Sequence, residues 1–220
     1  MMKALFIESK YDKKIKLNEN LIKKLPSTIG LVSAVQFSGA LKDLKNQIKK
    51  LGKKAVIGKG KQKYAGQVLG CDVSAAEKIN GEVDCFLYIG DGKFHPAEIA
   101  LKTRKPIFTF NPFNNKLNKI NKKEIELIEK RRKAAYSKFL YSKNIGILVS
   151  TKPGQNKLKQ AIDLKNRLKG KNCYILIFDT LGINELENFN FIDCFVNTAC
   201  PRIVDDVGKA VVNINEIQNL

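Results

Sequence analysis

The sequence lacks the features of a membrane or secreted protein. It has no apolar run of about 18 or more residues, so no segment is predicted to span a membrane. The stretch from Met1 to Glu8 is too short and too soon charged to be a signal peptide. The five cysteines are an odd number and lack the spacing of a small disulfide-bonded domain. These absences predict a cytoplasmic protein whose thiols are free or bound to a metal.

Several catalytic and nucleotide-binding signatures are also absent. The sequence contains neither a GxGxxG fingerprint nor a P-loop, so neither kind of nucleotide site is predicted. His95 is the only histidine, so a serine or cysteine triad would have to use it. A single histidine more often has a structural role, but His95 is kept as a candidate because it lies in a loop just after a predicted strand.

The chain carries an excess of positive charge that is not confined to one region of the sequence. The chain has 40 lysines and arginines against 21 aspartates and glutamates, a formal net charge of +19. These basic residues are spread along the whole chain, whereas nucleic-acid binders usually gather them in a stripe or a known motif. We therefore expect a solvated basic surface and no direct nucleic-acid partner, and a basic α/β protein that binds nucleotide or RNA is kept as an alternative.

The order of apolar segments predicts an α/β protein with two related, parallel-sheet, flavodoxin-like three-layer domains joined by a long helix. The strand–helix alternation restarts at Ile145, after a charged, helix-prone segment, which is a weak internal repeat. Predicted strands cover 29–35, 55–57, 83–89, 106–110, 145–149, 173–178 and 210–212, and predicted helices cover 41–51, 96–102, 122–143 and 158–168. The predicted divisions are an N-terminal connector (1–26), a first domain (27–113), a linker with the bridging helix (114–142) and a second domain (143–220).

Two of the five cysteines lie where a thiolate could act. Cys71 follows Gly70 at the predicted start of a helix, where the macrodipole favours a thiolate. Cys200 lies on a loop between an apolar run and Pro201. Loops at the carboxyl ends of parallel strands bind ligands in α/β sheets, so we expect the scaffold to bring these two sulfurs together at an iron–sulfur cluster or metal. Two cysteines do not complete a four-coordinate site, so a third ligand must come from elsewhere or a substrate must fill the vacancy.

The other cysteines and several polar loops have weaker signals. Cysteines within apolar strand runs are usually buried, which predicts that Cys85, Cys173 and Cys194 are inert. The turn 90–92 could approach a ligand closely, and the loop 150–155 could bind an anion or be a plain loop. The pair 205–206 could bind a cation or orient a donor, or could be two surface acids.

Four motifs then appear in order along the chain. They are GQVLGC at 66–71, YIGDGKFHP at 88–96, VSTKPGQ at 149–155 and FVNTACPR at 195–202. Together they closely resemble the archaeal diphthamide synthases, the 3-amino-3-carboxypropyl transferases of the first step of diphthamide synthesis. The resemblance covers roughly residues 29 to 213.

The resemblance implies a specific chemistry. Members of that family fold as three related α/β domains, each of which gives one cysteine to a 4Fe-4S cluster, and S-adenosylmethionine takes the fourth iron position. The 3-amino-3-carboxypropyl group is transferred as a radical to a histidine of translation elongation factor 2. Cys71 matches the second cluster cysteine and Cys200 the third. The expected substrate-binding residues are Gly90, Asp91, Gly92, His95, Gln155, Arg202 and Asp206.

The chain departs from this family at its beginning. Only 28 residues precede Ile29, and none of them is cysteine. The chain therefore resembles the second and third domains alone. We expect a separate polypeptide to supply the first domain and the remaining cluster cysteine, in a dimeric or higher assembly with elongation factor 2 as substrate. The alternatives are a non-catalytic accessory subunit and the basic nucleotide- or RNA-binding protein.

Overall fold

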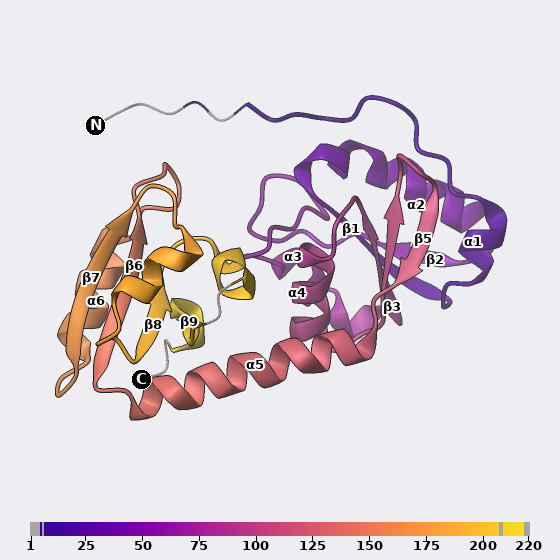
Figure 1. The fold of residues 1–220 in the computed structure, drawn as a ribbon. Coiled ribbons are helices and arrows are strands. Elements are labelled where there is room, and N and C mark those ends of the chain that lie inside the picture. The colour runs from indigo at the N-terminus through magenta and orange to yellow at the C-terminus, as the bar shows by residue number, and fades with distance from the viewer. Residues whose placement is uncertain (1–4, 6, 207–208, 218–220) are drawn as a thin grey trace. The chain divides into compact units, whose positions relative to one another are not determined.

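The computed structural model describes residues 5, 7–206 and 209–217, except for the side chains of Ile183, Asp205 and Asp206. The chain divides into two compact units, Met1–Ile125 and Glu126–Leu220. Each unit contains its own sheet, as Figure 1 shows. None of the helices in the described part of the chain is both long and apolar enough to cross a membrane.

The first unit is built on a five-stranded sheet in the order β2-β1-β3-β4-β5. Four strands are parallel, and β5 pairs antiparallel with β4. The order 2-1-3-4-5 is that of flavodoxin-like folds. The central strand β3 is buried at every position, as expected for a parallel strand covered on both faces. The strands are β1 (Thr28–Ser33), β2 (Lys54–Val56), β3 (Cys85–Ile89), β4 (Ile107–Asn111) and β5 (Lys116–Lys119).

Helices cover both faces of this sheet and complete three layers (Figure 1). On one face, α2 (Leu41–Lys50) buries Leu41, Leu44 and Ile48, which share one side of the helix because they are three and four residues apart. The short α1 (Glu19–Lys23) adds Ile22 to the same core. On the other face, α3 (Ser74–Glu77) and α4 (Phe94–Thr103) pack in a second core.

The second unit repeats this strand order. Its four strands are all parallel and follow the order β7-β6-β8-β9, which is the 2-1-3-4 arrangement of the first unit. On one face, α6 (Leu158–Arg167) and the end of α5 (Lys122–Tyr141) form a core with β6 and β8. The other face is covered by short 3-10 turns. The strands are β6 (Asn144–Ser150), β7 (Asn172–Phe178), β8 (Cys194–Asn197) and β9 (Val211–Asn213).

The repeat extends to individual contacts. Gly30 on β1 lies opposite Phe86 on β3, and a Cβ at this glycine would be 2.6 Å from the ring. Gly146 on β6 lies opposite Phe195 on β8, with the same 2.6 Å approach. The glycine in each first strand thus makes room for a phenylalanine of the third strand. The internal repeat predicted from the sequence pattern is therefore also present in the packing.

An aspartate before each third strand holds the start of the first strand. The Asp84 carboxylate accepts a hydrogen bond from the Thr28 N–H at 2.8 Å. The Asp193 carboxylate accepts from Lys143 N at 3.0 Å and Asn144 N at 2.8 Å. The bond from Asn144 is the main reason that the pKa of Asp193 is below its usual value. These contacts align the neighbouring strands at their amino ends and leave the carboxyl ends for the motifs.

The structure extends the first unit beyond the limits predicted for the first domain. Residues 1–26 were expected to be a connector, but Ile15, Leu17, Ile22 and Leu25 are buried in its core. At the other end, residues 116–119 lie past the predicted boundary at 113 and form β5. Sequence patterning missed β5 because its residues, KLNK, are mostly polar and exposed.

Candidate functional site

Cys71 lies at the tip of a small hairpin after β2. The Ser33 N–H donates to Gly66 O and the Val68 N–H donates to Ser33 O, both at 2.9 Å, so this segment extends the carboxyl end of β1. Leu69 and Asp72 then exchange two backbone hydrogen bonds of 2.9 and 3.1 Å. Gly70 and Cys71 form the turn between them. The thiol of Cys71 is therefore exposed on a fixed backbone.

The predicted helix-dipole effect at Cys71 is not supported. The helix that follows, α3, has only four residues and begins at Ser74. The Ser74 N–H donates to Asp72 Oδ1 at 3.0 Å, so the donor at this turn is used by the aspartate. Burial raises the pKa of Asp72, but hydrogen bonds from Gln62 and Ser74 outweigh it and hold the pKa below its usual value. One helical turn is too short for the macrodipole that the prediction invoked.

The second motif packs directly against the first. A Cβ at Gly70 would overlap the ring of Phe94, which is the first residue of α4. The tip that carries Cys71 therefore rests on the motif that contains His95. This contact joins the motifs at 66–71 and 88–96 at one edge of the first unit.

His95 has a structural contact in this motif. Its ring stacks on Tyr88 with a centroid distance of 5.7 Å and an interplanar angle of 13°. The Tyr88 hydroxyl lies 3.4 Å from His95 Nδ1. Burial, with a smaller effect of Asp91, raises the pKa of Tyr88 to about 12. Gly90 lies against the same tyrosine ring, where a Cβ would be 2.8 Å from the hydroxyl oxygen. A substrate-binding role for His95 stays a prediction.

The glycine turn after β3 lines a cavity of about 240 Å³. Asn111 Nδ2 donates to Asp91 Oδ1 at 3.0 Å, and Lys93 forms a 2.9 Å ion pair with Glu124. At Gly92, where φ is +79°, a Cβ would meet no atom within 4 Å, so the backbone is open to a ligand. The lining residues are mostly of polar types or glycine and include Gly90, Asp91, Gly92, Lys93, Asn111 and Asn118. Three of the predicted substrate-binding residues thus line one cavity of the first unit.

Cys200 lies on a loop held by Asn197. β8 ends at Asn197, whose side chain donates to Cys200 O and to Asn213 Oδ1, both at 2.9 Å. Its Oδ1 accepts from the Ala199 N–H at 2.9 Å. The Thr198 hydroxyl donates to Leu148 O at 2.7 Å and ties the loop to β6. The half-buried Cys200 is therefore also on a well-defined backbone.

The remaining predicted residues of the second unit lie at the same edge of its sheet. Gln155 is half-buried on the loop after β6, and its N–H donates to Lys152 O at 3.0 Å. Arg202 is exposed on the 3-10 turn after Cys200. Because β6 and β8 are neighbouring parallel strands, their following loops both leave from the carboxyl edge. The side chain of Asp206 lies outside the described residues.

The two candidate cysteines occupy different places in the repeat. Cys71 follows the second strand of its unit, whereas Cys200 follows the third strand. Aligning the two units on their DCF sequences, 84–86 and 193–195, places Asp91 opposite Cys200. The structure brings Cys71 together with the 88–96 motif in one unit, and Cys200 together with Gln155 at one edge in the other. That the two sulfurs meet stays a prediction.

Two of the three remaining cysteines are buried as predicted. Cys85 and Cys194 are fully buried, and burial raises the pKa of each thiol to about 12. The prediction was wrong for Cys173, which is only half-buried although burial still raises its pKa. Cys173 lies on β7, which is an edge strand of its sheet. An apolar run of sequence does not distinguish an edge strand from a central one.

We expect the five thiols to react with iodoacetamide at different rates in the folded chain. Cys71 should react first, Cys200 next and Cys173 more slowly, because exposure favours alkylation and burial raises the pKa of the Cys173 thiol. Cys85 and Cys194 should stay unmodified until the chain unfolds. Peptide mass spectrometry at mildly alkaline pH gives each rate separately. Labelling of Cys85 or Cys194 as fast as that of Cys71 would contradict the buried positions.

Sequence reasoning missed two residues that shape these loops. Asn197 ends an apolar run, and a buried asparagine at a strand end could have been read as a signal for a held turn. Phe94 had no such signal, because its contact with Gly70 joins segments that are distant in sequence.

Comparison with known proteins identifies the family. A family model described as "Putative diphthamide synthesis protein" matches residues 1–218. The chain belongs to this family. The 2-(3-amino-3-carboxypropyl)histidine synthase of Pyrococcus horikoshii is 34% identical over 214 residues, which are 93% of this chain and 60% of that protein. The synthase of Methanocaldococcus jannaschii is 35% identical over 176 residues, which are 76% of this chain and 51% of that protein.

Solved structures of family members share the fold. The structure of Dph2 from Pyrococcus horikoshii with a 4Fe-4S cluster matches with a TM-score of 0.74 and 30% identity. The match covers 91% of this chain and 58% of that chain. A second structure of Dph2 from the same organism matches with a TM-score of 0.77. The chain thus has the α/β fold of this family and spans about three fifths of the Dph2 chain.

Proposed function

We propose that Cys71 and Cys200 are two of the protein ligands of a 4Fe-4S cluster, and that this chain takes part in diphthamide synthesis. In the proposed reaction, a 3-amino-3-carboxypropyl group passes from S-adenosylmethionine to a histidine of translation elongation factor 2. The main support is the fixed, exposed position of Cys71 in a member of a family whose relatives are named 2-(3-amino-3-carboxypropyl)histidine synthases. Because translation takes place in the cytoplasm, we place the reaction there.

The chain can supply some of the thiolate ligands of such a cluster. Thiolates are the usual ligands of iron–sulfur clusters, and Cys71 and Cys200 are on loops at strand ends, not inside a core. Among the described residues, no three His, Cys, Asp or Glu side chains form a group that could hold a metal ion. The family resemblance implies a third cluster cysteine beside these two. We propose that a separate polypeptide with a first α/β domain supplies it, in a dimeric or higher assembly.

The residues of the chain would orient the substrates. A bound, reduced 4Fe-4S cluster would supply one electron for cleavage of the bond between the sulfur and the γ-carbon of S-adenosylmethionine. The held hairpin of Cys71 and the Asn197-bound loop of Cys200 fix the two ligands with little loss of entropy on binding. The cavity beside Gly92 offers amide groups and both signs of charge, which suit the amino and carboxylate groups of the substrate. The products would be methylthioadenosine and the modified histidine, and the imidazole ring would lose one proton and one electron, which balances the electron taken from the cluster.

The proposal predicts transfer only in the assembled system. The chain should be reconstituted anaerobically with iron and sulfide, alone and with a polypeptide that carries a first domain. Carboxyl-labelled S-adenosylmethionine, elongation factor 2 and a reductant are then added. We expect a stable cluster absorbance, methylthioadenosine and labelled factor with both polypeptides, and labile absorbance without transfer from the chain alone. The reason is that two thiolates leave the cluster without its third protein ligand.

Other results would overturn parts of this proposal. A stable, fully occupied cluster in the isolated chain would contradict the need for a partner. Formation of 5′-deoxyadenosine would show that a different bond is cleaved. Binding to the first-domain polypeptide without cluster or transfer would favour the non-catalytic subunit, and salt-dependent RNA binding in place of transfer would favour the RNA-binding alternative.

A further inference from the structure

The segment 8–17, called here the N-terminal arm, is held against the first unit. The Tyr11 N–H donates to Gln36 O at 2.9 Å. Its ring lies 5.4 Å from that of Phe37 and 5.6 Å from that of Phe113, measured between centroids. Further along the arm, the Leu17 N–H donates to Gln47 Oε1 at 2.9 Å. Contacts at both its middle and its end therefore fix the path of the arm.

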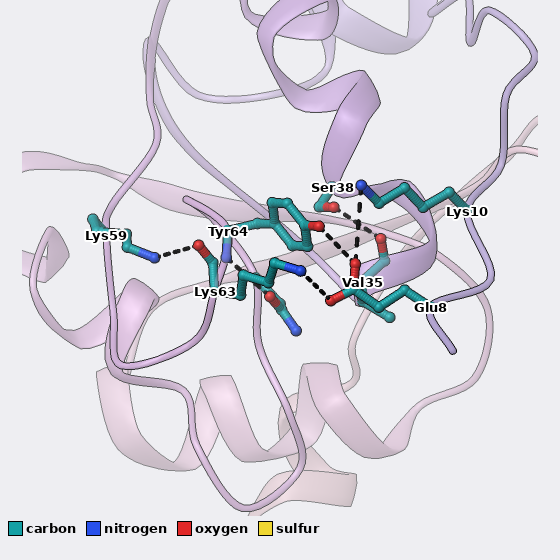
Figure 2. A network of polar contacts seen from close by, with 8 residues as sticks. Glu8, Lys10, Val35, Ser38, Lys59, Lys63 and Tyr64 are labelled. Carbon is teal, nitrogen blue, oxygen red and sulfur yellow. Dashed lines mark hydrogen bonds and ion pairs between the residues drawn. The ribbon is translucent and has the colours of Figure 1, made fainter. Parts of the chain in front are cut away.

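At the start of the arm, Glu8 contacts the long loop that precedes Cys71 (Figure 2). The Tyr64 hydroxyl donates to Glu8 Oε2 at 2.6 Å, and Lys63 Nζ lies 3.2 Å from Oε1. Lys10 Nζ lies over the Tyr64 ring, 4.4 Å from its centroid, in a cation–π contact. The hydrogen bond from Tyr64 is the main reason that the pKa of Glu8 is below its usual value. Glu8 is therefore a charged acceptor for this loop.

Tyr64 connects Glu8 to the base of the Cys71 hairpin. The Tyr64 N–H donates to Gln67 Oε1 at 3.0 Å, and the Gln67 N–H donates to Tyr64 O at 3.2 Å. Gln67 is the residue that forms the bridge to Ser33 at the end of β1. The hairpin 69–72 begins two residues later. A chain of direct contacts thus runs from Glu8 through Tyr64 and Gln67 to the segment that presents Cys71.

The loop needs such a contact because it has little regular structure of its own. Residues 57–73 contain no helix or strand between β2 and α3. Long segments of this kind open locally more easily than the strands around them. Other contacts in the middle of the loop, such as Lys59 Nζ to Lys63 O and Gln62 Nε2 to Asp72 Oδ2, both at 2.6 Å, stay within the loop. The arm, which is anchored independently by Tyr11 and Leu17, supplies a fixed point there.

We propose that Glu8 is a positioning residue for Cys71. Glu8 acts through Tyr64 and so holds the base of the hairpin that carries Cys71. Whether Glu8 holds this loop in place can be tested without any cluster. The consequence for a bound cluster rests on the proposed function, since it requires Cys71 to be a ligand. Glu8 touches neither the thiol nor any reacting atom, so it is expected to affect how long the cluster is retained and not which reaction occurs.

Hydrogen exchange measured by mass spectrometry on the full chain tests the first part. Glu8→Gln and Tyr64→Phe should each raise the exchange rate of the amides in 66–72 about two- to fivefold, the range expected for an exposed charged contact. The double variant should be close to the stronger single variant, because the two side chains act as one unit. Amides of β3 in the same unit and of β6 in the other unit should be unchanged.

Asp12→Asn is the matched control. Asp12 is an exposed carboxylate on the same arm, and the structure gives it no side-chain hydrogen bond or ion pair among the residues it describes. Its replacement should leave exchange in 66–72 unchanged. Unchanged exchange in both Glu8→Gln and Tyr64→Phe would overturn the proposal. So would an equal rise across β3, because that would show a general loss of stability and no specific effect on the loop.

The cluster reconstituted with the first-domain polypeptide tests the second part. Under a fixed concentration of an iron chelator, Glu8→Gln should shorten the half-life of the cluster absorbance about two- to fivefold, in step with the exchange rate. Asp12→Asn should match the unsubstituted chain. Faster exchange with an unchanged half-life would overturn the link to Cys71. If no cluster forms with the unsubstituted chain, the proposed function fails, and the exchange experiment still decides whether Glu8 holds the loop.

Discussion

Replacing Cys200 with alanine is expected to abolish both cluster binding and group transfer in the assembled system. The loop of Cys200 is fixed by the Asn197 side chain and the Thr198 hydroxyl. It contains no other cysteine that could take the place of Cys200 as the proposed ligand. Cys71→Ala should have the same effect, because Cys71 lies at the tip of a hairpin whose backbone is held on both sides. The measurements are the cluster absorbance after anaerobic reconstitution and the label transferred to elongation factor 2.

Cys173→Ala is the matched control for this experiment. It removes the same atom from the same unit, at a half-buried position on the edge strand β7. We expect a loss of about 1 kcal/mol or less in the free energy of unfolding, typical of a small truncation at a partly buried site, with cluster and transfer retained. Methylthioadenosine and labelled factor formed at normal rates by Cys200→Ala would show that Cys200 is not a ligand.

The sequence pattern alone was sufficient to predict the strands that are buried on both faces of a sheet. The apolar runs of β1, β3 and β6 have no competing interpretation within an alternating α/β pattern, and the structure contains all three strands. The same reasoning failed for β5, which is polar and exposed at the sheet edge. It also failed for Cys173, because burial at an edge depends on what lies beside the strand and not on the strand's own residues.

The location of the candidate site could be predicted only in part. The rule that ligands bind at the carboxyl ends of parallel strands placed Cys71 and Cys200 on loops at these edges, where the structure has them. The helix-dipole argument for Cys71 has little support, since the helix predicted after it is a single turn, residues 74–77. The contacts that fix the hairpin, from Tyr64 to Glu8 and from Gly70 to Phe94, join residues far apart in sequence. No local pattern encodes such pairs.

The second large effect is expected from Gly70→Ala. A Cβ at this position would overlap the Phe94 ring, which itself packs edge-to-face on His95 with a centroid distance of 5.7 Å. The ring cannot move away without disturbing the start of α4, so the hairpin must shift instead. Overpacking of this kind typically costs about 1–3 kcal/mol of stability. We expect a loss of this size in urea unfolding, together with faster hydrogen exchange in 66–72.

Two further variants separate the clash from a general effect of removing a glycine. Gly81→Ala is the matched control, because no atom lies within 4 Å of its Cβ position, and it should leave both readouts unchanged. Phe94→Ala removes the clashing ring. Combined with Gly70→Ala, it should restore the slow exchange of 66–72, and the loss of stability of the double variant should be smaller than the sum of the two single losses. Additive losses, or a Gly70→Ala chain as stable as Gly81→Ala, would show that Phe94 does not support the Cys71 hairpin.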